Sequence, residues 1–291
     1  MYLDHFGLSR PPFRITPDTQ SFFEGSERGA TLHAICYAIS TGEGITKVVG
    51  EVGTGKTMLC RMLPHKLTRG ITWVYLAHPR LSPPQMLQEI AREMGLKLPV
   101  RRDKLTVMRQ IQADLLRRHA RNERVVVLVE EAQEMPLETL EELRLLSNLE
   151  TDEYKLLQIV LFGQPELDEK LASRKIRQLR ERVTHSLYLS PLKLDDVHAY
   201  LNFRVRASGY KGPDLFSRAT ARSVLKYSHG LIRRINILAD KALMSGYARG
   251  IHDIRPDDIY RAAVDSEYTS KPRWWPFRSG FNAQTGGVLS R

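Results

Sequence analysis

Eight residues near position 50 constrain this chain more than any other stretch. Residues 50–57 read G-x-x-x-x-G-K-T, a pattern in which a glycine-rich loop joins a strand to a helix and surrounds a phosphate with backbone N–H groups. The flanks agree, because residues 45–49 form a β-branched run typical of a buried strand and residues 58–67 form an apolar-rich helical stretch that Pro64 could kink or shorten. A chance glycine turn before Lys-Thr would not require these flanks. The sequence therefore predicts a phosphate loop.

The residues of this loop have distinct expected roles. Gly50, Gly53 and Gly55 allow a tight turn and a close approach of the backbone to the phosphates. Lys56 can reach the β- and γ-phosphates, and the Thr57 hydroxyl can ligate Mg²⁺. ATP and Mg²⁺ are thus the expected cofactors. The remaining positions expected to contact the nucleotide are Glu51, Val52, Thr54 and Met58.

Composition bounds the class of protein. The chain has 291 residues, 44 Lys and Arg against 33 Asp and Glu, a formal net charge of +11 and a pI near 9.7. This charge suggests an anionic partner, either nucleic acid or an acidic membrane surface. The N-terminus lacks the basic start and apolar core of a signal peptide, and no apolar run approaches the length of a membrane span, so we expect a cytoplasmic protein.

Strand and helix patterns alternate up to about residue 190 and then change. Residues 71–77, 125–129, 156–162 and 186–189 read as further strands, with helices expected at 26–41, 85–94, 105–119, 137–149 and 166–182. Such alternation predicts an α/β fold with a parallel sheet flanked by helices. Beyond it, only helical patterns occur, at 194–207, 214–227, 231–248 and 256–266. We expect an α/β domain at 1–190, including an extended N-terminal segment, and a small all-helical domain at 191–268.

The last stretch, residues 269–291, has the composition of a disordered tail with one cluster of aromatic residues. It contains Trp274, Trp275 and Phe277 among basic residues, and it has no acidic residue after position 270. Aromatic and basic side chains together suit the interface between water and anionic lipid, or an acidic groove on a partner protein. Packing of the aromatics onto the folded domains is the alternative.

A second chemical site follows the apolar run 125–129, where Glu130 and Glu131 stand next to each other. In an open α/β sheet, ligands bind beyond the carboxyl ends of the strands. There Glu130 can support the metal, and Glu131 can activate the attacking water. Two acids after a strand are weak evidence alone, but about 70 residues after a phosphate loop they indicate nucleotide hydrolysis.

These features together resemble an AAA+ ATPase, and one branch of that class in particular. Residues 6–8 (FGL), 12–13 (PF), 17–18 (PD), 131–133 (EAQ) and 161–167 (LFGQPEL) are similar to the general secretion pathway protein A family and its MSHA-type pilus relatives. The resemblance covers roughly residues 1–268. Family members have Asp where this chain has Glu130, which shifts the carboxylate by one methylene. Secretion-type members also continue into a membrane span, so the shorter pilus-type relatives fit this chain better.

The resemblance implies three further site residues. Gln164 would contact the γ-phosphate or the attacking water as sensor 1 does. Arg233 would reach the phosphates from the helical lid as sensor 2, with Arg234 as its competitor. Arg182 would be the arginine finger that acts on a neighbouring subunit, with Arg180 as the alternative. A solvated basic surface remains the simpler reading of the arginines.

The preferred interpretation is an ATPase whose cycle drives assembly of an envelope machine of pilus or secretion type. Expected partners are further copies of the chain, with a hexamer as one candidate, an inner-membrane pilus or secretion component, and an anionic membrane surface through the tail. One rival is a DNA-acting ATPase such as a transposition helper, which suits the charge, although no DNA-binding domain is visible after residue 268. The other is a nucleotide-gated adaptor with slow hydrolysis, which Glu130 keeps open.

Overall fold

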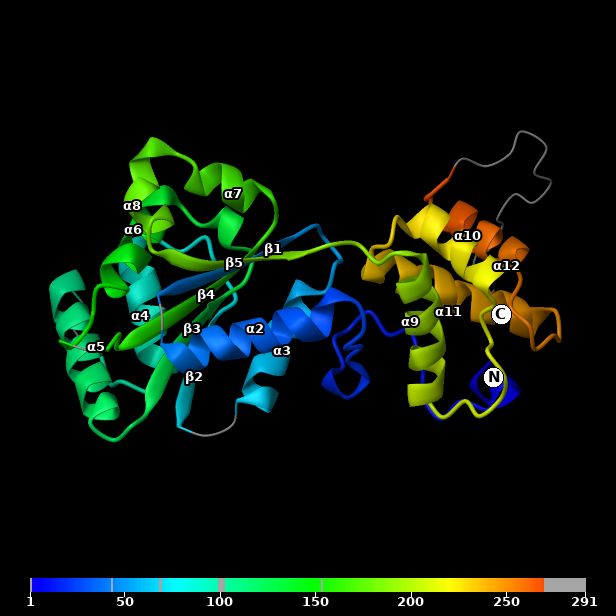
Figure 1. Ribbon diagram of the computed structural model, residues 1–291, viewed down its shortest axis with the longest axis horizontal. Helices are drawn as coiled ribbons and strands as arrows, with labels where there is room; N and C mark the ends of the chain where they lie inside the picture. The colour runs from blue at the N-terminus through cyan, green and yellow to red at the C-terminus, as the bar shows by residue number, and fades with distance from the viewer. Residues whose placement is uncertain (1, 43, 68–69, 99–102, 153, 270–291) are drawn as a thin grey trace, which may run out of the picture.

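The computed structural model describes residues 2–42, 44–67, 70–98, 103–152 and 154–269. The expected tail, with Trp274, Trp275 and Phe277, lies outside these residues. Figure 1 shows an α/β unit and a helical unit joined by the chain that leaves the last strand. Among the described residues, no helix is both long and apolar enough to cross a membrane.

The α/β unit contains a parallel sheet of five strands in the order β2-β3-β4-β1-β5. β1, the strand that leads into the phosphate loop, pairs with β4 on one side and β5 on the other. β3 and β4 are buried almost along their whole length, as their unbroken apolar runs predict. The bounds are β1 Ile45–Gly50, β2 Ile71–Leu76, β3 Arg124–Val129, β4 Leu157–Gly163 and β5 Val183–Leu189.

Helices cover both faces of this sheet (Figure 1). α2 (Glu27–Thr41) and α3 (Lys56–Lys66) pack on one face, and the core there includes Leu32, Leu59 and Phe162. The other face is covered by α4 (Pro83–Glu93), α5 (Lys104–His119) and α6 (Leu137–Leu146). Pro64 lies inside α3, which nevertheless continues to Lys66. The fold class predicted from the sequence is confirmed.

The prediction of one helix over residues 166–182 is wrong in detail. The structure divides it into α7 (Glu166–Leu171), a 3-10 turn (Arg174–Ile176) and α8 (Arg177–Arg180). The break follows from Ser173, whose side chain accepts a hydrogen bond from the Lys175 N–H at 3.4 Å and so starts a new turn. β5 also begins three residues earlier than predicted, at Val183, because an edge strand with alternating burial carries a weaker apolar signal.

The helical unit consists of α9 (Leu194–Ala207), α10 (Arg218–Ser228), α11 (Ile232–Ala248) and α12 (Pro256–Asp265), close to the predicted ranges. Its core also takes up the N-terminal segment, which begins with α1 (Tyr2–Phe6). Phe6 and Phe13 are buried there, and the Phe13 ring meets Phe216 edge to face at 5.6 Å. The segment that the sequence groups with the α/β domain therefore has its buried side chains in the helical unit.

Candidate nucleotide site

A cavity of about 310 Å³ lies where the two units meet. Its walls come from the phosphate loop and the start of α3, from the N-terminal segment at 14–17 and 21–23, and from α9 and α11. Each wall is held by a different part of the fold, so the cavity exists only when the helical unit sits against the α/β unit. This arrangement suits a ligand that contacts both units at once and whose binding therefore affects both.

The phosphate loop has the backbone that its glycines predict. Gly53 and Gly55 have φ values of +83° and +105°, a region that residues with a Cβ rarely adopt. A Cβ on Gly50 would lie 2.8 Å from the Thr54 hydroxyl oxygen, so the close packing inside the loop also requires glycine there. α3 begins directly after Gly55, at Lys56, which places the positive end of the helix dipole at the loop.

Lys56 is folded back onto its own loop. Its Nζ donates to the carbonyl oxygens of Gly50 at 2.6 Å and Glu51 at 3.1 Å. Burial lowers the pKa of the Lys56 ammonium, and the negative charge of Glu131 acts in the opposite direction. The cation is thus held at the loop, and its two carbonyl contacts can be exchanged for phosphate oxygens.

Glu130 stands just past β3 and beside the start of α3. The Thr57 hydroxyl donates to its Oε2 at 3.4 Å, and its Oε1 is buried without a hydrogen-bond partner. The Tyr75 hydroxyl and the Cys60 thiol also lie next to this carboxylate; burial raises the pKa of both groups, and the charge of Glu130 raises it further. A hydroxyl beside a carboxylate with one unused oxygen is a donor set that suits Mg²⁺, so the residues present fit the metal that the sequence predicts.

Glu131 is held in a network of two glutamines. Gln133 and Gln164 donate their side-chain amide N–H groups to Glu131 Oε2 at 2.7 and 2.9 Å. The side-chain oxygen Oε1 of Gln133 in turn accepts from the Gln164 backbone N–H at 3.0 Å. Burial acts to raise the pKa of Glu131, but the hydrogen bonds from Gln164 and Gln133 and the charge of Lys56 together lower it. Glu131 also has a φ of +50°, an unusual conformation for a residue with a side chain. The carboxylate is therefore ionised and fixed in direction.

The two arginines at the start of α11 point to different places. The Arg233 backbone N–H donates to the Gly53 carbonyl oxygen at 3.3 Å, and its side chain lines the cavity. The Arg234 guanidinium instead lies 5.2 Å from the centre of the Tyr268 ring. Of this pair, only Arg233 faces the phosphate loop.

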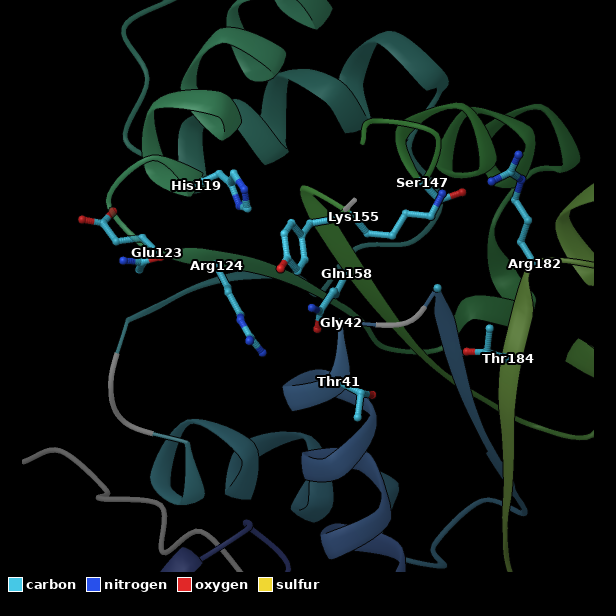
Figure 2. A pocket seen from close by; sticks show the side chains of 13 residues that line it. Thr41, Gly42, His119, Glu123, Arg124, Ser147, Lys155, Gln158, Arg182 and Thr184 are labelled. Carbon is cyan, nitrogen blue, oxygen red and sulfur yellow. The ribbon is translucent and has the colours of Figure 1, made fainter. Parts of the chain in front are cut away.

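Arg182 lies at the opposite end of the sheet. Its carbonyl oxygen accepts from the N–H of Ile45, the first residue of β1, whereas the phosphate loop follows the last. At about 3.3 Å per residue, the whole strand separates them. Figure 2 shows Arg182 at the rim of another cavity, of about 880 Å³, together with Arg124 and Gln158. Arg182 therefore cannot reach the nucleotide cavity of its own chain. Arg180, the alternative, is exposed on α8.

Sequence reasoning missed one member of the Glu131 network and two groups of residues that line the cavity. Gln133 was noted only as part of a motif, yet it bonds both Glu131 and Gln164. Ile15 and Phe22 come from the N-terminal segment, where the density of proline and aromatic residues was the only signal. No sequence pattern indicated that Arg28, at the start of α2, would line the cavity. Met58, which the sequence analysis names, also lines the cavity, together with Tyr200, Ile232 and Asn236, which it does not name.

Comparison with known proteins agrees with this architecture. Residues 39–171 match the family model of the AAA domain. The fold resembles that of Cdc6p from Pyrobaculum aerophilum, with a TM-score of 0.65 and 17% identity over 90% of this chain and 70% of that one. It also resembles the Aeropyrum pernix ORC2 protein, solved as ADPNP-ADP complexes, with a TM-score of 0.63 and 18% identity over 85% and 72% of the two chains. These structural likenesses show the fold alone.

Residues 39–171 of the chain thus match an AAA domain, within a parallel α/β fold that is followed by a C-terminal helical region. The chain is related to general secretion pathway protein A of Aeromonas hydrophila, to which it is 38% identical over 294 aligned positions. That alignment covers 99% of this chain and 52% of the relative, so the chain spans about half the length of that protein.

Proposed function

We propose that this protein binds ATP with Mg²⁺ and hydrolyses it to ADP and phosphate. The observation that carries the proposal is the convergence of Lys56, Thr57, Glu130 and Glu131 at one end of the sheet, with Gln164 fixing the second acid. These groups lie at the start of α3 and just past the ends of β3 and β4, which are distant in sequence. A site for phosphate binding alone would not need an oriented carboxylate beside it.

In this proposal each side chain has one task. Lys56 exchanges its bonds to Gly50 and Glu51 for bonds to the phosphates. Glu131 orients the attacking water and accepts its proton. Thr57 and Glu130 would hold Mg²⁺, which neutralises charge that develops on the transferring phosphoryl group. We assign Arg233 to the phosphates, since it lines the cavity from the helical unit.

We also propose a cellular role, based on the similarity to general secretion pathway protein A. A general secretion pathway protein suggests that ATP turnover powers or regulates assembly of an envelope machine, and the sequence resemblance favours a pilus-type system. The proposed setting is the cytoplasm, peripheral to the inner membrane, with an inner-membrane component as the partner. DNA-acting AAA proteins remain the rival, and DNA binding that weakens steeply with salt would support them instead.

The first experiment is a phosphate-release assay on the purified full chain with ATP, with and without Mg²⁺. We expect turnover that requires the metal and is absent from Lys56→Ala. Tight ATP binding without turnover would support the alternative function, a nucleotide-gated adaptor with slow hydrolysis. A pull-down from the native host with Glu131→Gln as an ATP-locked bait would then identify the partner, and a matched pull-down with Lys56→Ala is its control.

The tail is proposed to bind anionic membrane, on the basis of its sequence alone. Deletion of residues 271–291 should weaken binding to vesicles that contain anionic lipid and leave ATP turnover unchanged. Neutral vesicles provide the control. A truncated chain that melts several degrees lower, with vesicle binding intact, would show that the tail packs on the folded units.

A further inference from the structure

Arg28 is a buried cation beneath the phosphate loop. It stands in the first turn of α2, its relative exposure is 3%, and it lines the nucleotide cavity. Burial lowers the pKa of its guanidinium, with Asp196 and Tyr200 acting in the opposite direction. A buried charge is unfavourable unless it is paired, so this arginine needs an explanation.

The hydrogen bonds of Arg28 go to one backbone oxygen in the phosphate loop and one in the connection between the two units. Its Nη2 donates to the carbonyl of Thr54, inside the phosphate loop, at 3.0 Å. The same nitrogen donates to the carbonyl of Ser190, between β5 and α9, at 3.3 Å. Thr54 is fully buried, and Ser190 is the first residue after β5 on the path into the helical unit. One rigid, planar group thus joins the loop to the connection between the units.

The bonding capacity of the guanidinium is not used up. Its Nε is buried without a hydrogen-bond partner, and within the described ranges no carboxylate forms an ion pair with Arg28. This nitrogen lies beside the start of α3, because a Cβ on Gly55 would be 4.0 Å from it. An unpaired buried donor costs stability, which is more easily understood in a residue kept for function than in one kept for packing.

We propose that Arg28 is a positioning residue that couples phosphate binding to the placement of the helical unit. The inference rests on the proposed function, since it requires a nucleotide in the loop. Phosphate binding holds the peptide of Thr54, Arg28 transmits this restraint to Ser190, and the helical unit is fixed in turn. By reciprocity, the same contacts make the nucleotide affinity depend on the connection.

Lysine would not replace this residue. An ammonium group is a compact point charge on a flexible stem, whereas the guanidinium presents donors in a fixed plane. Arg28→Lys should therefore keep the charge beneath the loop but not the rigid connection from Thr54 to Ser190. Comparison of Arg28→Lys with Arg28→Met separates the electrostatic contribution from the coupling.

The test uses the full chain and two measurements. The first is the dissociation constant for Mg²⁺-ADP, and the second is hydrogen exchange of the backbone amides at 189–194 with and without saturating Mg²⁺-ADP. In the wild type, ADP should slow this exchange several-fold. In Arg28→Met, affinity should fall by about tenfold or more, the effect expected for a bond to a charged group. At saturation, ADP should no longer slow exchange at 189–194.

Arg222→Met is the matched control, since it removes the same charge from an exposed position on α10. It should behave as the wild type does. Arg28→Lys should bind ADP more tightly than Arg28→Met yet also lose the slowing of exchange, and it tests the proposal even where Arg28→Met fails to fold. Protection of 189–194 by ADP in either folded Arg28 variant, equal to that in the wild type, would overturn the inference. Absence of ADP binding by the wild type would instead overturn the proposed function.

Discussion

The two ends of the parallel sheet differ in what they can do alone. The carboxyl end brings together a cation, a hydroxyl, two carboxylates and an orienting amide, all from one chain. The amino end has a larger cavity with Arg182 at its rim (Figure 2). The length of β1 separates this cavity from the groups at the carboxyl end. The carboxyl end thus has most of the groups that nucleotide hydrolysis needs. The amino end has the Arg182 cation, which lies far from the phosphate loop of its own chain.

We propose that the chain works as an oligomer. If Arg182 acts on a nucleotide, that nucleotide must belong to a neighbouring copy, and stacking the amino end of one copy against the carboxyl end of the next would bring the two together. The comparison also predicts how variants should behave. Changes at the carboxyl end should act within one chain, whereas changes at Arg182 should be rescued by a second copy.

Lys56→Ala should have the largest effect, with loss of nucleotide binding and of all turnover. The reason is that the phosphate charge loses its cationic partner, while the backbone N–H groups alone bind too weakly. Binding of a fluorescent ATP analogue measures this directly. Lys66→Ala, at the exposed end of the same helix, is the control and should bind normally. ATP affinity equal to that of the wild type would show that the loop is not the phosphate site.

Arg182→Ala should lower turnover by about a thousandfold, the lower range for arginine fingers, and leave ATP binding intact. Mixing it with Lys56→Ala should recover activity, because some interfaces would then combine an intact loop with an intact arginine. Arg180→Ala tests the alternative assignment and should leave turnover near the wild-type rate. If no mixing ratio restores turnover, the two ends do not meet between copies, and the contrast between them has another cause.

Glu131→Gln should keep ATP binding and lower turnover by about a hundredfold or more. The amide preserves the shape but cannot accept a proton from water. Single-turnover phosphate release measures the chemical step. Glu134→Gln, three residues later, is the control. Turnover near the wild-type rate would move the base elsewhere, with Glu130 as the next candidate.

Gln164→Leu should shift the pH profile and lower turnover at neutral pH by about fivefold, the value of one hydrogen bond. Since Gln164 helps to lower the pKa of Glu131, its removal raises that pKa. Turnover requires the ionised acid, so the acidic limb of the profile should move to higher pH. Gln158→Leu, at the amino end of the same strand, is the control and should leave the limb unmoved. An unchanged limb in Gln164→Leu would separate Glu131 from the observed pH dependence.

Local patterns account for the parts of this molecule that the sequence predicts. The glycines at 53 and 55 require a turn, the run 125–129 requires burial, and both features lie within a few residues of the groups they position. The phosphate loop, the two acids and the alternation of strands and helices follow from such short-range rules. Because parallel strands end at one edge, even the meeting of Glu131 and Gln164 could be anticipated.

The rest depends on contacts between residues far apart in sequence. Phe13 packs on Phe216, and Arg204 donates to the Pro12 carbonyl oxygen at 2.8 Å, so no local rule places the N-terminal segment with the helical unit. Arg28 reads as an ordinary exposed residue near a helix start, but in the structure it is buried and bonds to both the phosphate loop and the chain after β5. The choice between the two arginines of α11 depends on the rotational phase of that helix against the loop.

Glu130→Asp should have the smallest effect, within about threefold of wild-type turnover in either direction. It introduces the acid that the sequence resemblance implies at this position and shortens the side chain by one methylene. The Thr57 hydroxyl already lies 3.4 Å from the longer acid, and Tyr75 and Cys60 border it, so the pocket is built around a glutamate. The shorter carboxylate lies farther from the Thr57 hydroxyl, so the two groups should bind Mg²⁺ less tightly. This should appear first as a higher Mg²⁺ concentration for half-maximal turnover. Glu134→Asp, which shortens an exposed acid by the same methylene, should leave that concentration unchanged and serves as the control. Complete loss of activity in Glu130→Asp would show that metal binding at the carboxyl end depends on the longer side chain, and a rise in turnover would indicate that glutamate slows this site.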